Sequence, residues 1–160
     1  MKRYLLTTGL SLAALAASGV CASHASHAAG KPTKGEIEVE YRQSLYTVIA
    51  GNFGPLGAMA EGKVPFDAAD AKVRAQRIAF LAPMLKEAFP PDSNGVAHTA
   101  AKPEIWTNAA EFDKALQLLI DKTAALSAAA GSGDADKTKA AIQETGKACK
   151  GCHDKFKVKE

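Results

Sequence analysis

The stretch Cys149-Lys150-Gly151-Cys152-His153, close to the C-terminus, decides how the rest of the chain is interpreted. Cys-x-x-Cys-His is the spacing at which two thiols add to the vinyl groups of a haem as thioethers, giving a c-type haem. Three residues make almost one helical turn, so both thiols fall on one face of a helix with the imidazole beside them. The motif predicts one covalent haem c, attached through Cys149 and Cys152, with its iron ligated by His153.

Other roles for a Cys-x-x-Cys pair fit this sequence less well. A thioredoxin-like redox pair lies at a strand-to-helix junction, early in a βαβ unit, whereas this pair ends a helical stretch. A structural zinc site needs four ligands, and only Cys21 and three scattered histidines remain to supply them. Two free thiols in an exported protein would normally form a disulfide, which argues against a chance occurrence.

The N-terminus has the pattern of a secretory signal peptide. Lys2 and Arg3 precede an uncharged, mostly apolar run over 5–20, and small-residue cleavage sites follow up to Ala28. The apolar run is short for a membrane anchor, and Val20 before Cys21 does not suit lipoprotein processing. We expect a signal peptide over 1–28, a single domain over 29–160 and a periplasmic location.

Charge excludes some classes of partner. The formal charge of the 160-residue chain is +3, and loss of the basic residues of the leader brings it close to neutral. A nearly neutral domain is a poor fit for nucleic-acid binding, which needs clustered positive charge. No later segment is long and apolar enough to cross a bilayer, so we expect no membrane span.

Four segments show the apolar periodicity of helices, with turn-rich breaks between them. They run over about 35–53, over 67–89, from Asn108 to the turn at 131–133, and from Asp134 or Asp136 through the Cys-x-x-Cys-His motif. The motif shares the apolar face of the last helix. The sequence therefore predicts an all-α, antiparallel up-down-up-down four-helix bundle with haem attached near the C-terminus. Haem at one end of a bundle buries its faces and leaves an edge near solvent.

Local signals set the expected helix boundaries. Gly54-Pro55 should end the first helix, and Asp67 should cap the second. Pro83 removes a backbone hydrogen bond and should kink the second helix. Asn108 and Glu111 have the spacing of a capping box at the third.

Three stretches of the chain resemble cytochrome c′, a class II c-type cytochrome. They are the end of the last helix, Cys-x-x-Cys-His-Asp-x-Phe-Lys over 149–157, the Tyr-Arg-Gln-Ser sequence over 41–44, and Pro-Glu-Ile-Trp over 103–106. The resemblance covers essentially the whole mature chain. It implies a homodimer, and two apolar stripes on the first helix agree with this, because an exposed apolar surface usually marks an interface.

The resemblance also implies roles for four further residues. Arg42 would accompany the haem propionates, since a guanidinium pairs bidentately with a carboxylate, and Gln43 would bind beside it. Tyr46, one turn further, would press on the distal haem face, and Lys157 would lie near the proximal His153. Without the resemblance, these residues would be interpreted as an exposed Arg, a core Tyr and a solvated terminal Lys. We expect Trp106 to close the end of the bundle.

A sixth iron ligand is missing from the first helix, which has no Met, His or Cys in its predicted range. Met59 lies beyond Gly54-Pro55 in a predicted loop, Met84 in the second helix, and His98 in a long loop. We therefore expect five-coordinate iron with a site open to small diatomic gases but crowded by Tyr46.

Two functions follow from this. The first is a periplasmic haem protein that binds nitric oxide or carbon monoxide, transfers electrons to a periplasmic redox partner, or does both. The alternative is a pure electron-transfer cytochrome with no physiological gas-binding role. We expect no enzyme activity, because a peroxidase needs a distal acid–base pair that the first helix does not offer.

Overall fold

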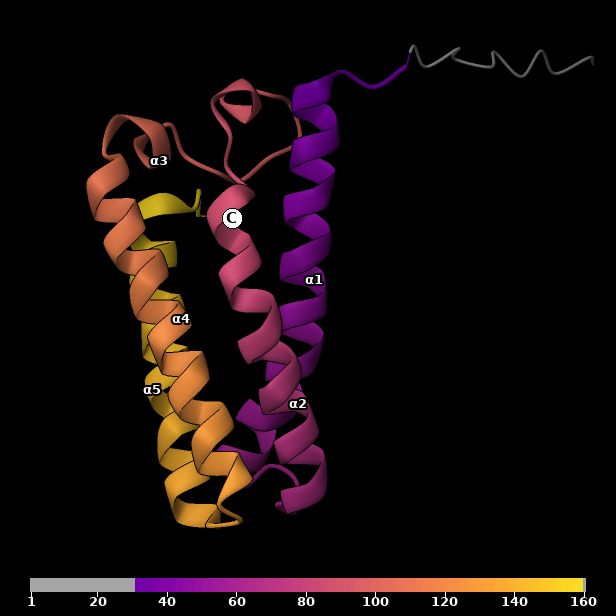
Figure 1. Ribbon diagram of the computed structural model, residues 1–160, viewed down its shortest axis with the longest axis vertical. Coiled ribbons are helices and arrows are strands. Elements are labelled where there is room, and N and C mark those ends of the chain that lie inside the picture. The colour runs from indigo at the N-terminus through magenta and orange to yellow at the C-terminus, as the bar shows by residue number, and fades with distance from the viewer. Residues whose placement is uncertain (1–30, 160) are drawn as a thin grey trace, which may run out of the picture. The chain divides into compact units, whose positions relative to one another are not determined.

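Four long helices make up most of residues 31–159, the part of the chain that the computed structural model describes (Figure 1). The predicted signal peptide over 1–28 lies outside these residues. In chain order the elements are α1 (Lys34–Ala60), α2 (Ala68–Leu81), the 3₁₀ segments η1 (Ala82–Glu87) and η2 (Pro91–Ser93), the short helix α3 (Glu104–Thr107), α4 (Ala109–Gly131) and α5 (Ala135–Phe156).

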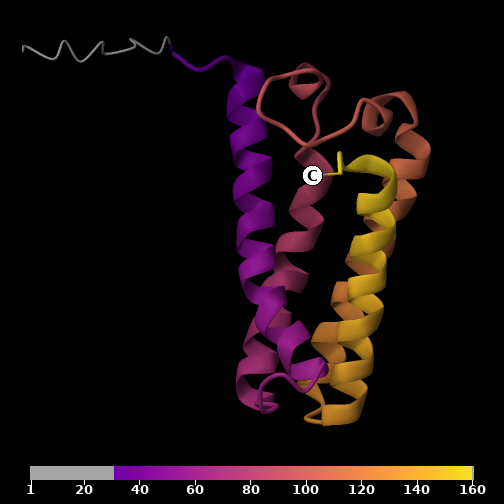
Figure 2. The ribbon, with the colours of Figure 1, turned by 180° about the vertical axis from the view of Figure 1, so that it is seen from behind.

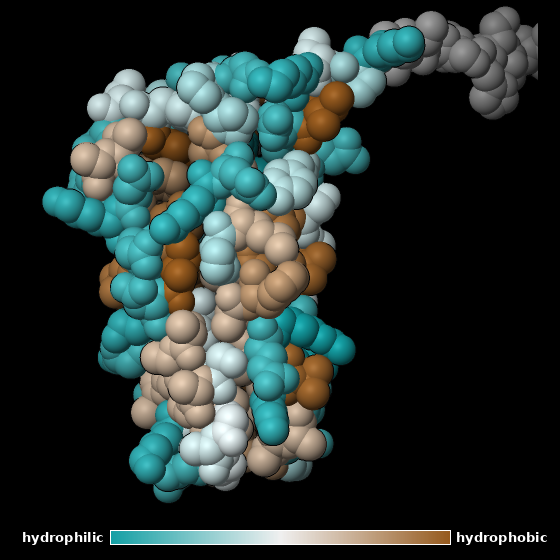
Figure 3. Space-filling view, in the orientation of Figure 1, coloured by the Kyte–Doolittle hydropathy of each residue, from teal (hydrophilic) through white to brown (hydrophobic). Residues whose placement is uncertain are grey.

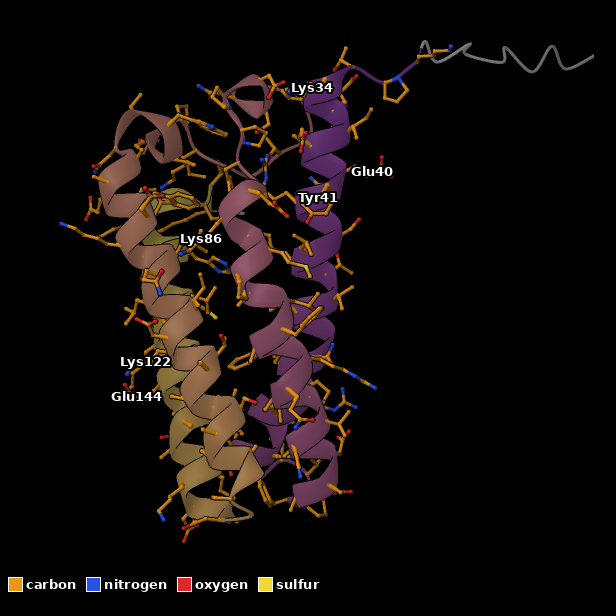
Figure 4. The ribbon with its side chains drawn as sticks, in the orientation of Figure 1. Lys34, Glu40, Tyr41, Lys86, Lys122 and Glu144 are labelled. Carbon is orange, nitrogen blue, oxygen red and sulfur yellow. The ribbon has the colours of Figure 1, made fainter. Side chains whose placement is uncertain are left out.

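The four long helices form an antiparallel bundle in which each helix packs on two others. α1 packs on α2, α2 on α4, α4 on α5, and α5 on α1 (Figures 1 and 2). Between α4 and α5, Lys122 forms an ion pair with Glu144 at 3.3 Å (Figure 4). The described residues contain no strand, only one β-bridge between Ala101 and Lys157. The predicted all-α four-helix bundle is confirmed.

Two of the helix starts follow the predicted chemistry. Asp67 caps α2, because its Oδ1 accepts hydrogen bonds from the backbone amides of Ala69 and Asp70 at 2.9 and 3.0 Å. Asp134 caps α5 by accepting from the amide of Lys137 at 3.0 Å.

The predicted capping box at Asn108 is wrong. Asn108 does precede α4, but its side chain makes no capping hydrogen bond to the helix backbone. Its Nδ2 instead donates to Glu111 Oε2 at 2.6 Å, so the two side chains satisfy each other.

The first helix does not end at Gly54-Pro55, as the sequence predicted, but continues to Ala60. Proline lacks the amide that would bond the carbonyl four residues back, which here belongs to Gly51. Arg74 of α2 supplies the missing donor, because its Nη1 donates to the Gly51 carbonyl oxygen at 3.3 Å. The neighbouring helix therefore compensates for Pro55, and Met59 lies in a helix rather than in the predicted loop.

The predicted single helix over 67–89 is two elements. α2 stops at Leu81, and the chain continues as the 3₁₀ segment η1, with Pro83 in its first turn. The break falls where the sequence placed a kink, because Pro83 cannot donate the next helical hydrogen bond. η1 follows α2 directly and packs against α2, α4 and α1.

The end of the bundle next to the C-terminus is covered by the segment between η1 and α4 (Figures 1 and 2). The last four residues of the predicted loop over 92–107 form the short helix α3. Trp106 of α3 closes this end, as expected: its Nε1 lies 3.1 Å from the carbonyl oxygen of Phe89 and 3.3 Å from that of Pro90.

None of the helices over residues 31–159 combines the length and the apolar character that crossing a membrane requires.

We expect replacement of Gly35 by alanine to destabilise the protein by about 1–3 kcal/mol, the usual cost of overpacking. A Cβ on Gly35 would lie 2.3 Å from the Asp92 carbonyl oxygen and 2.8 Å from Val96 Cγ2, so η2 and the loop after it would have to move. The ion pair between Lys34 and Asp92 at 2.7 Å belongs to the same contact. Urea unfolding of the haem-loaded protein, followed by far-ultraviolet circular dichroism, measures the change.

Gly57→Ala in the same helix is the matched control. A Cβ there meets nothing within 4 Å, so this variant should be as stable as the wild type or more stable by up to about 1 kcal/mol. Equal stability of Gly35→Ala and Gly57→Ala would contradict the close seating of the loop on α1.

Candidate haem site

A cavity of about 590 Å³ opens between α1, α4, α5 and the loop before α3. Its volume lies within the range of about 300–1,000 Å³ that is usual for cofactor and ligand sites. All seven residues that the sequence predicted for the site lie on its wall: Arg42, Gln43, Tyr46, Cys149, Cys152, His153 and Lys157.

The wall formed by α5 carries the thiols. Cys149 and Cys152 are both free and partly buried against the core, one helical turn apart. Loss of solvent raises the pKa of each thiol, so both are held neutral. His153 follows at the exposed rim of the cavity. Desolvation, and then the positive charge of Lys157, lower the pKa of its imidazole, which favours the neutral form that binds metals.

The facing wall comes from α1. Tyr46 lies one turn after Arg42, and its ring packs edge-on against Phe89, with 6.4 Å between the centroids. Burial is the main cause of a raised pKa for the Tyr46 phenol, and the nearby Cys152 adds to it. Tyr46 on α1 and Cys152 on α5 line the same cavity.

The inner part of the cavity is aromatic. Phe89, Phe112 and Phe156 meet edge to face, with centroid distances of 4.7 Å between the first pair and 5.2 Å between the second. Sequence analysis did not assign these rings to the site. The sequence does indicate where these rings lie, because the apolar stripes that contain them all extend to the end of the bundle that holds the Cys-x-x-Cys-His motif.

Arg42 is buried, with 3% of its surface exposed, and it is bound to the protein itself. Its Nη1 donates to the Ala88 carbonyl oxygen at 3.0 Å and to Ser93 Oγ at 3.1 Å, and its Nη2 donates to Thr99 Oγ1 at 3.0 Å. The guanidinium also lies 4.7 Å from the centre of the Phe89 ring. These hydrogen bonds use three of its five N–H donors, so two remain for the predicted haem propionate.

Gln43 and Lys157 contact the same loop from opposite sides. Gln43 Nε2 donates to the His98 carbonyl oxygen at 2.6 Å. Lys157 pairs with Ala101 in the single β-bridge, directly after the end of α5. Sequence analysis missed this loop, over 98–102, as part of the site, because its hydrogen-bonding groups are mainly backbone atoms.

The other candidate iron ligands lie elsewhere. Met59 and Met84 are absent from the cavity wall, and His153 is the one histidine among its lining residues. Met59 is buried in the core, and Met84 packs against it. Within residues 31–159, no group of three or more His, Cys, Asp or Glu side chains is arranged to hold a metal ion.

The residues of this cavity fit a covalently bound haem. Two neutral thiols and an imidazole from one helix open onto a largely apolar cavity of suitable volume, and a buried guanidinium with spare donors lies on the facing helix. The family model for cytochrome c′ matches residues 38–157. The chain belongs to the cytochrome c′ family.

Known members of this family align with the chain over nearly their whole length. A cytochrome c′ of Rubrivivax gelatinosus is 48% identical over 124 residues, which cover 76% of this chain and 94% of that protein. Cytochrome c prime from Shewanella frigidimarina superposes with a TM-score of 0.75 at 41% identity, covering 80% of this chain and 99% of the other. The nitric oxide complex of a mutant of cytochrome c prime from Alcaligenes xylosoxidans superposes with a TM-score of 0.73 at 39% identity, covering 79% of this chain and 98% of the other.

Proteins of the cytochrome c′ family bind covalent haem c, and this chain, which has the cysteines for it, does so too. Once bound, haem supplies an iron centre with axial coordination positions and two accessible redox states. The protein supplies the walls: α5 holds the attachment side, and α1 faces it.

We expect the double variant Cys149→Ala, Cys152→Ala to lose covalent haem completely. In the wild type, two thioethers should keep the haem on the polypeptide through denaturing electrophoresis, where a haem stain detects it. In the double variant, haem should extract into acidic organic solvent. Cys21→Ala is the control and should retain the stain, because Cys21 lies in the predicted leader. Extraction of haem from the intact wild type would contradict attachment at this motif.

Proposed function

We propose that the protein is a periplasmic haem protein whose five-coordinate iron, ligated by His153, binds small diatomic gases such as nitric oxide and carbon monoxide. The observation that carries the proposal is the composition of the cavity wall. His153 is its one histidine, it holds no methionine, and the facing helix presents Tyr46, whose phenol is held protonated by burial. Such a wall offers no second ligand of the kinds that commonly complete haem coordination.

Nitric oxide complexes of the Alcaligenes xylosoxidans relative support gas binding. That protein is 39% identical to this chain, and 98% of it is covered in the superposition with the mutant complex. The shared fold, at this level of identity, supports transfer of this property to the present protein.

Tyr46 sets how easily a ligand enters. Its ring is packed against Phe89, which in turn contacts Trp106 and Phe112, so the ring has little room to move aside. Close-packed interiors resist the insertion of even a few atoms, and a ligand on this side has to displace the ring. We infer that the site discriminates among gases by the strength of the bond that each forms with iron.

Electron transfer to a periplasmic redox partner is the second candidate function. Its support is the position of the site, since His153 and Gln43 lie at an exposed rim, which would leave one edge of the haem near solvent. A pure electron carrier would use this edge alone, and the open coordination position would have no physiological role.

We propose that the protein is not an enzyme. Haem enzymes that cleave an O–O bond use a distal acid–base pair. Among the residues that line the cavity there is no Asp or Glu, and the one His is on the attachment side. The periplasmic location rests on the signal-peptide pattern over 1–28.

We further propose a homodimer formed through α1 and α2. On α1 the structure leaves Ile37 and Val48 exposed at 51% and 50%, with the exposed Tyr41 between them, whereas Leu45 of the same apolar stripe is buried in the core. Tyr41 donates to Glu87 at 3.3 Å, which places this face beside the segment that follows α2, and Phe80 of α2 is 71% exposed. Hydrophobic surface over α1 and α2 is visible between hydrophilic side chains (Figure 3).

Phe80→Glu should convert the dimer to a monomer, because it places a charge in an apolar interface. Sedimentation velocity at micromolar concentration measures the change. Leu118→Glu on α4 is the control, since Leu118 is also exposed, at 47%, but lies on another helix. A monomeric wild type, or equal dissociation in both variants, would contradict an interface on α1 and α2.

Tyr46→Ala should raise carbon monoxide affinity at least tenfold, because the ligand no longer has to displace the ring. It should also lower stability by about 3 kcal/mol, near the low end for aromatic truncations, since the ring is only partly buried. Carbon monoxide titration of the ferrous protein, followed by absorption, measures affinity. Tyr46→Phe keeps the ring and should bind as weakly as the wild type. An unchanged carbon monoxide affinity in Tyr46→Ala would contradict this role of Tyr46 and would mean that another side chain restricts access to the iron.

A further inference from the structure

The loop that ends at α3 crosses the open end of the cavity. Its residues 98–102, which we term the strap, run between α1 and the C-terminal end of α5. Thr99, Ala100 and Ala101 of the strap line the cavity. The strap, the end of α5 and α3 lie at the same end of the bundle in both ribbon views (Figures 1 and 2).

On one side the strap is paired with the C-terminus. The amide of Val158 donates to the Ala100 carbonyl oxygen at 2.8 Å, and the amide of Lys102 donates to the Phe156 carbonyl oxygen at 3.0 Å. This pairing begins where α5 ends, one turn after His153. The strap therefore holds the end of the helix that carries the predicted iron ligand.

On the other side the strap is bound to α1, and the one side-chain group of the strap that takes part is the hydroxyl of Thr99. Thr99 Oγ1 accepts a hydrogen bond from Arg42 Nη2 at 3.0 Å and another from the Ala101 amide at 3.2 Å. Arg42 is one turn before Tyr46 on the same helix. A continuous series of hydrogen bonds thus joins the α1 wall, through Thr99 and the strap, to the end of α5.

The backbone next to Thr99 is strained, which is a second and independent sign that the strap is held in place. His98 has a φ of 63°, in the left-handed region that residues other than glycine rarely adopt. Gln43 of α1 donates to the His98 carbonyl oxygen at 2.6 Å. A strained residue of this kind persists only where its surroundings fix it, and here α1 does so.

We propose that Thr99 is a positioning residue: its hydroxyl oxygen links α1 to the strap and thereby fixes the end of α5 that carries His153. The hydrogen bonds of Thr99 set the separation between the wall that carries Tyr46 and the wall that carries the iron ligand. The proposal rests on the assignment of His153 under the proposed function, but not on gas binding.

Thr99→Val tests this assignment, because it keeps the shape of the side chain and removes the oxygen. The Nη2 donor of buried Arg42 would then lose its partner, which costs more than the hydrogen bond itself. We expect the amides of Lys102 and Val158 to exchange with solvent about tenfold faster in the haem-loaded variant, as measured by nuclear magnetic resonance. The iron–histidine stretching band of the ferrous protein should shift and broaden in resonance Raman spectra.

Two variants serve as controls. Thr99→Ser retains the hydroxyl group and should restore both the exchange rates and the Raman band. Thr107→Val makes the same substitution at an exposed threonine whose hydroxyl bonds only the Pro103 carbonyl oxygen, at 3.3 Å, outside the cavity; it should change neither readout. If Thr99→Val does not fold, Gln43→Ala, which releases the His98 carbonyl, should accelerate exchange at the same two amides.

Unchanged exchange at Lys102 and Val158 in Thr99→Val would overturn the link between α1 and the strap. Faster exchange with an unchanged Raman band would show that the strap does not position His153, and would also overturn the proposal. Neither readout involves an added gas, so failure here is distinct from failure of the Tyr46→Ala titration, which tests gas binding.

Discussion

The buried guanidinium of Arg42 is the interaction on which the cavity end of the bundle depends. Only 3% of the Arg42 surface is exposed, and a charge buried to this extent needs hydrogen-bond partners, since burial of an unpaired charge is costly. Its partners, Ala88, Ser93 and Thr99, span the chain from the end of η1 to the strap. This segment, whose short helical turns supply little order of their own, is thereby folded over the end of the bundle, and a cavity forms beneath it.

The rest of the bundle supports that end. Away from the cavity, small and aliphatic residues such as Leu56, Ala75 and Leu126 are almost fully buried and bring the helices close together. Near the cavity, the core consists instead of the aromatic rings of Phe89, Phe112 and Phe156, which leave room between α1 and α5. The same helical periodicity that buries the core of α5 therefore directs its two thiols into that space.

Much of the fold and of the candidate site could be predicted from the sequence, because these features depend on local sequence patterns. Helix periodicity placed the Cys149–His153 motif on an inner face, and family resemblance placed Arg42 and Tyr46 on the facing wall. The rest depends on partners distant in sequence. Pro55 does not end α1 because Arg74 of another helix bonds the carbonyl that it leaves free. The role of the strap rests on backbone atoms and on the hydroxyl of Thr99, and a single threonine in a loop has no distinctive signature in the sequence.

The central claim is that His153 is the sole protein ligand of the iron and that the opposite position is left open beside Tyr46. The most direct test is the spin state of the ferrous, haem-loaded wild type at neutral pH without added ligand, measured by absorption and magnetic circular dichroism. We expect a high-spin ferrous spectrum, typical of five-coordinate iron with one imidazole. A low-spin spectrum would require a sixth ligand from the protein and would contradict the account.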